Sequence, residues 1–121
     1  MAGKLAAKVY HADKVYFCPN GTTGLNDVCA SVVIRPGDLV LFYCNNHKSL
    51  YNGALLMNEA ISVYLLTDRN ALGLTGEMYA AKFNEGYIRQ QIAKVAPTKA
   101  NVPRPFRMAV VQAGNIRWDL L

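Results

Sequence analysis

Charged side chains and long apolar runs are both scarce in this sequence. Asp, Glu, Lys and Arg make up 17% of the 121 residues, against about 25% in an average soluble domain. The longest apolar runs, such as residues 39–44, fall far short of the roughly 18 residues of a membrane span. The N-terminus also lacks the apolar core of a signal peptide. We therefore expect a cytoplasmic location and no membrane partner. Hydrophobic residues still make up 52%, too many for a disordered chain, so we expect one folded, partial domain over residues 1–121.

Cysteine is scarce as well, and its spacing supplies no metal or disulfide framework. The three cysteines, Cys18, Cys29 and Cys44, form no Cys-x-x-Cys pair, and the chain has two histidines. A structural zinc site or a disulfide scaffold needs more ligands at closer spacing. Each cysteine lies in an apolar stretch, where a free thiol behaves as a small hydrophobic group. We expect reduced, buried thiols and no metal site.

Positive charge is in excess but is not clustered. Thirteen Lys and Arg against eight Asp and Glu give a formal net charge of +5. Nucleic-acid binding requires cations gathered along one face, and here they are spread along the whole chain, with only Arg104 and Arg107 close together. We expect a solvated basic surface and no nucleic-acid partner.

Apolar periodicity divides the chain into alternating strands and helices. Short runs of β-branched and aromatic residues predict strands at residues 15–18, 39–43, 61–66 and 106–112. Helical spacing predicts helices at residues 4–11, from Thr22 or Thr23 to the turn at 35–38, at 47–57 and at 84–95. The 39–43 run is continuously apolar, which is typical of a strand buried on both faces. The order predicts an α/β fold with a largely parallel sheet of about four strands flanked by helices.

Two of these helices have recognisable starts. Thr22 or Thr23 is a suitable cap for the second helix, whose predicted buried face consists of Leu25, Val28, Cys29 and Val32. Asn45 and Asn46 are suitable caps for the helix at 47–57.

Both helix starts follow predicted strands, the place where open α/β sheets bind ligands. The turn at residues 20–24 reads Asn-Gly-Thr-Thr-Gly and is a plausible phosphate cup, although a turn of this kind also serves simply to begin a helix. It is neither a GxGxxG motif nor a P-loop. At the second start, a neutral His47 imidazole could stack on a flat ligand, or could lie in the capping region with no ligand.

Taken in order, these segments resemble one family, the bacterial ornithine/lysine/arginine decarboxylases. The resemblance is carried by Ala12–Lys14, Asn20–Thr23, Arg35–Asp38, Asn45–Ser49, Val63–Leu65 and Pro103–Arg107. It extends to about Gly114 and is nearest to the ornithine decarboxylases. The family consists of pyridoxal 5′-phosphate (PLP) enzymes of the aspartate-aminotransferase fold that act on basic amino acids. The resemblance therefore implies that residues 1–121 are the N-terminal part of a PLP-binding major domain.

The resemblance also implies roles for particular residues. The family's Asn-Gly-Thr-Ser/Thr turn binds the cofactor phosphate, a role that falls here on Thr22, Thr23 and the N–H of Gly24. The histidine of its Asn-x-His-Lys-Ser motif stacks on the pyridine ring, and here it is His47. The chain departs from the family at Gly24, where a small polar residue is usual, and at Asp27, where the family has lysine.

No residue corresponds to the lysine that forms the Schiff base with PLP or to the aspartate that pairs with the pyridine nitrogen. We therefore assign no catalytic residue and expect a fragment or degenerate homologue that is inactive alone, with uncovered strand edges that favour self-association. The alternative is a non-catalytic module that pairs with full-length decarboxylase subunits or binds a phosphate-bearing ligand. An independent enzyme of other chemistry finds no support, since the sequence has no Ser/His/Asp set, carboxylate pair or metal cluster.

Overall fold

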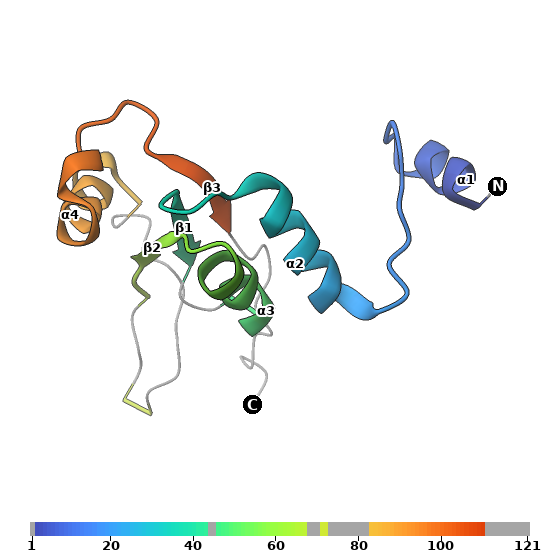
Figure 1. Cartoon of the computed structure of the whole chain (residues 1–121), viewed down its shortest axis with the longest axis horizontal. Coiled ribbons are helices and arrows are strands. Elements are labelled where there is room, and N and C mark those ends of the chain that lie inside the picture. The colour runs from blue at the N-terminus through green and yellow to red at the C-terminus, as the bar shows by residue number, and fades with distance from the viewer. Residues whose placement is uncertain (1, 44–45, 68–70, 73–82, 111–121) are drawn as a thin grey trace.

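A computed structural model describes residues 2–43, 46–67, 71–72 and 83–110 of the chain. Figure 1 shows helices arranged around a small sheet, with α1 lying away from it. In chain order the elements are α1 (Ala2–Val9), α2 (Gly21–Val33), β1 (Leu39–Tyr43), α3 (Lys48–Tyr51), the π-helical η1 (Asn52–Met57), β2 (Ile61–Leu65), α4 (Glu85–Val95), the 3-10 turn η3 (Pro97–Lys99) and β3 (Phe106–Val110). Among the described residues, no helix is both long enough and apolar enough to cross a membrane.

The sheet is parallel, with strand order β2-β1-β3. Leu39 pairs with Ile61 on one side and with Phe106 on the other, and the β3 register shifts by one residue after Leu39. All five residues of β1 are buried, as expected for a central strand covered on both faces. The α/β class is confirmed.

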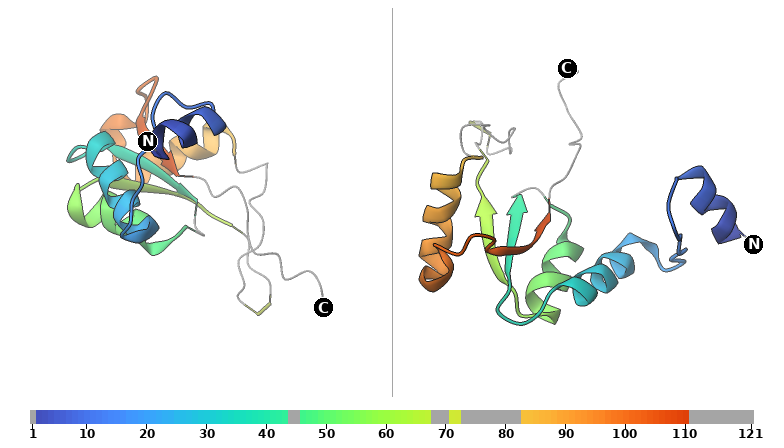
Figure 2. Two further views of the ribbon diagram at one scale, coloured as in Figure 1. Left: turned by 90° about the vertical axis from the view of Figure 1, so that its right-hand side faces the viewer. Right: turned by 90° about the horizontal axis from the view of Figure 1, so that it is seen from above.

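Helices cover both faces of the sheet (Figure 2). Alternate β1 residues belong to two apolar clusters, since successive side chains of a strand point to opposite faces. One cluster joins β1 and β2 to α4 and to the two residues that flank η3, Ala96 and Ala100. The other cluster joins β1 and β3 to α2 and η1. The fully buried side chains Leu39 and Ile92 lie in the first cluster, and Val40 and Phe42 lie in the second.

The predicted strand at residues 15–18 is wrong. This segment has no strand structure, and Tyr16 and Phe17 are 73% and 67% exposed. Residues 10–20 extend between α1 and α2, away from the sheet (Figures 1 and 2). The segment therefore has no neighbouring strand with which to form a ladder, and an isolated strand is not stable. The described part of the chain holds three strands rather than about four.

The predicted buried face of α2 is also wrong. Leu25, Val28 and Val32 are 41%, 59% and 78% exposed, while Ala30 is buried. Cys29 on the helix and Cys18 in the segment before it are both exposed, so neither is the buried thiol predicted. Cys44 lies outside the described residues. The helix packs through a small side chain, which lets its backbone approach η1 closely.

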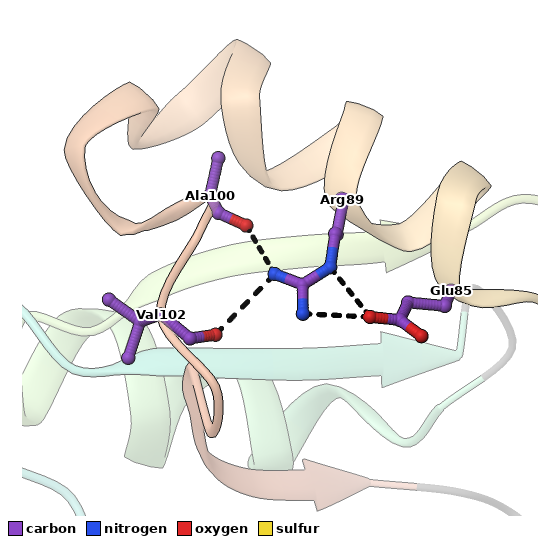
Figure 3. A network of polar contacts seen from close by, with 4 residues as sticks. All are labelled: Glu85, Arg89, Ala100 and Val102. Atoms are coloured by element: carbon purple, nitrogen blue, oxygen red, sulfur yellow. Dashed lines mark hydrogen bonds and ion pairs between the residues drawn. The ribbon is translucent and has the colours of Figure 1, made fainter.

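A clamp formed by Arg89 joins α4 to the chain that leads into β3 (Figure 3). Its Nη1 donates to the carbonyl oxygens of Ala100 at 2.6 Å and Val102 at 3.5 Å. Its Nε donates to Glu85 Oε1 at 2.8 Å, one helical turn earlier. The planar guanidinium can reach these acceptors at once because its donors form a fixed fork.

We predict that Arg89→Lys lowers the free energy of unfolding by about 1–2 kcal/mol, because an ammonium keeps the charge but cannot satisfy the same set of acceptors. Chemical denaturation followed by circular dichroism measures the loss. Arg104→Lys, at an exposed position in the link before β3, is the matched control and is expected to change stability by less than about 0.5 kcal/mol. Equal stability of the two variants would contradict the role of the clamp.

Candidate functional site

The start of α2 presents unsatisfied donors. Gly21 has φ +82°, a conformation that favours glycine, and it begins the helix directly after the N-cap residue Asn20. The Asn20 side chain makes no capping hydrogen bond within the described structure. Thr22 and Thr23 lie inside the first turn and are exposed, so the prediction that one of them is the N-cap is wrong. Backbone N–H groups and two hydroxyls therefore face solvent at this end of the helix.

Gly24 is the fourth residue of α2. At that position helix geometry gives its N–H an acceptor, the carbonyl oxygen of Asn20. The donors that helix geometry leaves available are therefore those of residues 21–23. A β-carbon at Gly24 would meet no atom within 4 Å, so this side of the first turn is open space.

Asn46 joins the carboxyl ends of two strands. Its Nδ2 donates to the carbonyl oxygens of Tyr43 at 2.7 Å and Val110 at 3.2 Å, the last residues of β1 and β3. Asn46 is therefore not the helix cap that the sequence predicted, and Asn45 lies outside the described residues. The structure holds the turn before α3 at the edge of the sheet where parallel α/β proteins bind ligands.

His47 is the N-cap of α3. Its Nδ1 accepts from the backbone N–H of Ser49 at 3.3 Å, which satisfies one of the free donors of that helix. The residue as a whole is exposed. Helical structure then runs through α3 and η1 to Met57, the extent that the sequence predicted.

Ser49 connects the two helix starts. Its Oγ lies 2.8 Å from Nδ1 of His47 and accepts from Nδ2 of Asn26 at 2.7 Å. Asn26 is one helical turn after Thr22 and lies on the same face of α2. The structure thus links α2, one helical turn after Thr22, to His47 through Ser49.

Close packing of α2 against η1 sets this arrangement. A β-carbon at Gly53 would lie 3.0 Å from Cβ of Ala30, 3.1 Å from Oδ1 of Asp27 and 3.3 Å from Cα of Asp27. Oδ1 of Asp27 is buried and has no hydrogen-bond partner in the described structure. The Asp27 carboxylate therefore lies against η1, several residues beyond the first turn of α2.

Comparison with known proteins gives the family. Residues 1–116 match the major domain of the Orn/Lys/Arg decarboxylases. The chain belongs to the Orn/Lys/Arg decarboxylase family. It is 53% identical over 114 residues to the constitutive ornithine decarboxylase of Escherichia coli, covering 94% of this chain and 16% of that protein. It is 50% identical to the ornithine decarboxylase of Haemophilus influenzae, again covering 94% of this chain and 16% of the relative.

The solved structure of the E. coli constitutive lysine decarboxylase aligns with a TM-score of 0.72 at 27% identity, covering 91% of this chain and 15% of that one. Identity to the Pseudomonas aeruginosa lysine decarboxylase LdcA is 33% over 106 residues, well below the values for the ornithine enzymes. The family and its ornithine branch are those that the sequence resembled. The chain spans about one sixth of the length of these decarboxylases.

The decarboxylase cofactor is compatible with the residues present at this edge. Free N–H groups and hydroxyls at a helix start suit a phosphate dianion, and an exposed imidazole suits a flat ring. The assignments of Thr22, Thr23, Gly24 and His47 to the cofactor stay predictions. No group of three or more His, Cys, Asp or Glu side chains that could hold a metal ion occurs among the described residues.

Sequence reasoning missed the residues that hold the candidate site together. Asn26, Asn46 and Ser49 each form hydrogen bonds between elements. A polar residue outside the apolar stripe of a helix ordinarily faces water, so the sequence did not indicate that Asn26 bonds to another helix. The partial signal was the pair of asparagines before His47, which indicated a capped turn but not its bonds to two strand ends.

We predict that Gly53→Ala destabilises the chain by about 1–3 kcal/mol, because the new methyl group meets the Asp27 backbone and the Ala30 side chain. Gly24→Ala is the matched control, where the methyl group enters open space. Alanine is the better helix former, so this change should raise stability by up to about 1 kcal/mol. Thermal and urea denaturation measure both, and a neutral or stabilising Gly53→Ala would contradict the close approach of α2 and η1.

Proposed function

We propose that this chain forms the part of a decarboxylase major domain that holds the phosphate of PLP and one face of its ring. The hydroxyls of Thr22 and Thr23 and the backbone N–H groups of residues 21–23 bind the phosphate, and His47 stacks on the pyridine ring. Gly24, whose N–H is paired within the helix, leaves the open space beside that turn. The observation that carries the proposal is the Asn26–Ser49–His47 link, which connects α2, one turn after Thr22, with the imidazole. The match to ornithine decarboxylases supports PLP as the ligand.

When bound in such enzymes, PLP supplies the electron sink for loss of carbon dioxide from a basic amino acid. The residues of this chain bind, orient and stack. None of its seven lysines stands in a Ser-x-His-Lys motif; Lys48 follows His47 but belongs to the Asn-x-His-Lys-Ser motif. We therefore propose cofactor binding without turnover by these 121 residues alone.

Binding of phosphate groups tests the proposal. We expect calorimetry to detect inorganic phosphate and PLP, and Thr22→Val or Thr23→Val to weaken both by about fivefold, the equivalent of one hydrogen bond of about 1 kcal/mol. Gly24→Ser adds a hydroxyl and should strengthen binding by a similar factor, with Gly24→Ala as its control. Asp27→Asn, which keeps the size of a side chain packed against η1, should act in the same direction as Gly24→Ser by removing negative charge.

Thr98→Val, in the exposed turn η3, controls for loss of a threonine hydroxyl elsewhere and should leave binding unchanged. No detectable phosphate binding in the wild type or in Gly24→Ser would show that the turn serves only to begin α2. Release of carbon dioxide from ornithine would contradict the absence of turnover.

A second proposal concerns association with another copy of the chain. Leu25, Val28 and Val32 form an exposed apolar face on α2, which we call the outer α2 face. Within the described sheet, β2 and β3 each have one edge without a neighbouring strand. Exposed apolar surface and open strand edges both favour pairing with another chain. This feature supports the self-association that the sequence leads us to expect of a fragment.

We expect sedimentation velocity to show self-association at tens of micromolar, roughly the concentrations at which such surfaces cause association. Replacing Val28 and Val32 together by Glu should restore the monomer, because charge on the outer α2 face opposes its burial. Replacing Gln90 and Ala93, at exposed positions of α4, by Glu makes the control variant with the matching number of added carboxylates. A monomeric wild type would contradict self-association, and pairing only with a longer decarboxylase subunit would replace it.

A further inference from the structure

Ser49 is the one polar residue that the described structure buries completely, with 2% of its surface exposed. A buried hydroxyl needs hydrogen-bond partners, because leaving it unpaired costs the desolvation of that group. Its partners come from two different elements, Asn26 on α2 and His47 at the start of α3. This buried position therefore connects the phosphate-binding turn proposed above with the imidazole.

The direction of each hydrogen bond follows from the donors available. The Asn26 amide donates from Nδ2 to Oγ of Ser49, so Oγ acts as an acceptor toward α2. The hydroxyl hydrogen of Ser49 is then free to point at Nδ1 of His47, which lies 2.8 Å from Oγ. The backbone N–H of Ser49 points at the same nitrogen. Two donors thus converge on Nδ1, which can receive them only through a lone pair.

We propose that Asn26 and Ser49 are positioning residues that hold His47 in one neutral tautomer, with Nδ1 unprotonated and the hydrogen on Nε2. The resemblance assigns a role to His47 alone, and this inference adds the two residues that orient it. The imidazole is held in plane by bonds to Ser49 before any ligand arrives. Its exposed edge presents an N–H donor at Nε2, which suits an oxygen acceptor on a ligand.

The same bonds couple the two halves of the candidate site. Asn26 lies one turn after Thr22 on α2, so a ligand held at the first turn of that helix sits at a fixed offset from the imidazole. The value of this coupling for a cofactor rests on the function proposed above. The tautomer of His47 does not depend on that proposed function, because it is a property of the chain without ligand.

Nitrogen-15 NMR of the histidine-labelled 121-residue chain tests the tautomer directly. At about pH 8.5, well above the ordinary histidine pKa, long-range nitrogen–proton correlations show which ring nitrogen carries the hydrogen. The chain has two histidines, and exposed His11 serves as the internal reference. We expect His47 to show a single Nε2–H tautomer and His11 to show the solvent-averaged mixture.

Variants then separate a positioning role from a merely structural one. Ser49→Ala removes one donor to Nδ1 and should move His47 toward the mixture seen for His11, while Ser49→Thr keeps the hydroxyl and should restore the wild-type spectrum. Asn26→Asp accepts from Ser49 instead of donating, which releases Oγ to accept from Nδ1 and should raise the Nδ1–H population. Ser31→Ala, at an exposed position of the same helix, should leave His47 unchanged.

Two results would overturn the inference. One is a wild-type spectrum that shows the hydrogen of His47 on Nδ1, or that shows the same tautomer mixture for His47 as for His11. This result does not depend on whether any variant folds. The other is an unchanged His47 spectrum in folded Ser49→Ala and Asn26→Asp. A phosphate and PLP titration on the same samples keeps the two proposals separate. Loss of binding with the tautomer intact would count against the proposed function alone.

Discussion

The structure depends on burial of β1 on both faces and on its hydrogen bonding along both edges. Its five residues are all buried, and neighbouring strands run parallel to it on each side. A parallel neighbour requires a crossover connection, which places helices on the faces of the sheet. From this follow the two apolar clusters. The helices that carry the candidate site residues, α2 and the α3–η1 segment, pack on the second cluster.

Small and polar side chains control how closely the helices approach that site. Ala30 and Gly53 let α2 and η1 pack near backbone contact, and this contact brings Asn26 within hydrogen-bonding distance of Ser49. Larger residues at these positions would separate the two helix starts. The apolar side chains of α2 that a helical pattern places inside remain on the outer α2 face. The close packing of α2 thus involves the residues next to the candidate site, and the apolar side chains of the outer α2 face stay exposed.

Membership in the Orn/Lys/Arg decarboxylase family is consistent with this arrangement. A match over residues 1–116 covers every described element, including α2 and α3. The chain spans about 16% of the length of its ornithine decarboxylase relative. The hydrogen-bonded link between its two helix starts lies wholly within that portion.

The sequence by itself determined the α/β class, the three strands of the sheet, the extents of α4 and of the α3–η1 segment, and the family. These follow from local patterns: continuous apolar runs, helical spacing, and motifs in a fixed order. Only the tertiary structure decided that residues 15–18 form no strand, since a ladder requires a partner that this segment does not reach. It alone decided which face of α2 is buried, because that depends on the fit of Ala30 against Gly53 and not on hydrophobicity. The tertiary structure also decided that Asn46 donates hydrogen bonds to the ends of β1 and β3 and that Asn26 donates to Ser49. Hydrogen bonds between residues 23 and 64 positions apart leave no local pattern, because each partner is chosen by the packing of other elements.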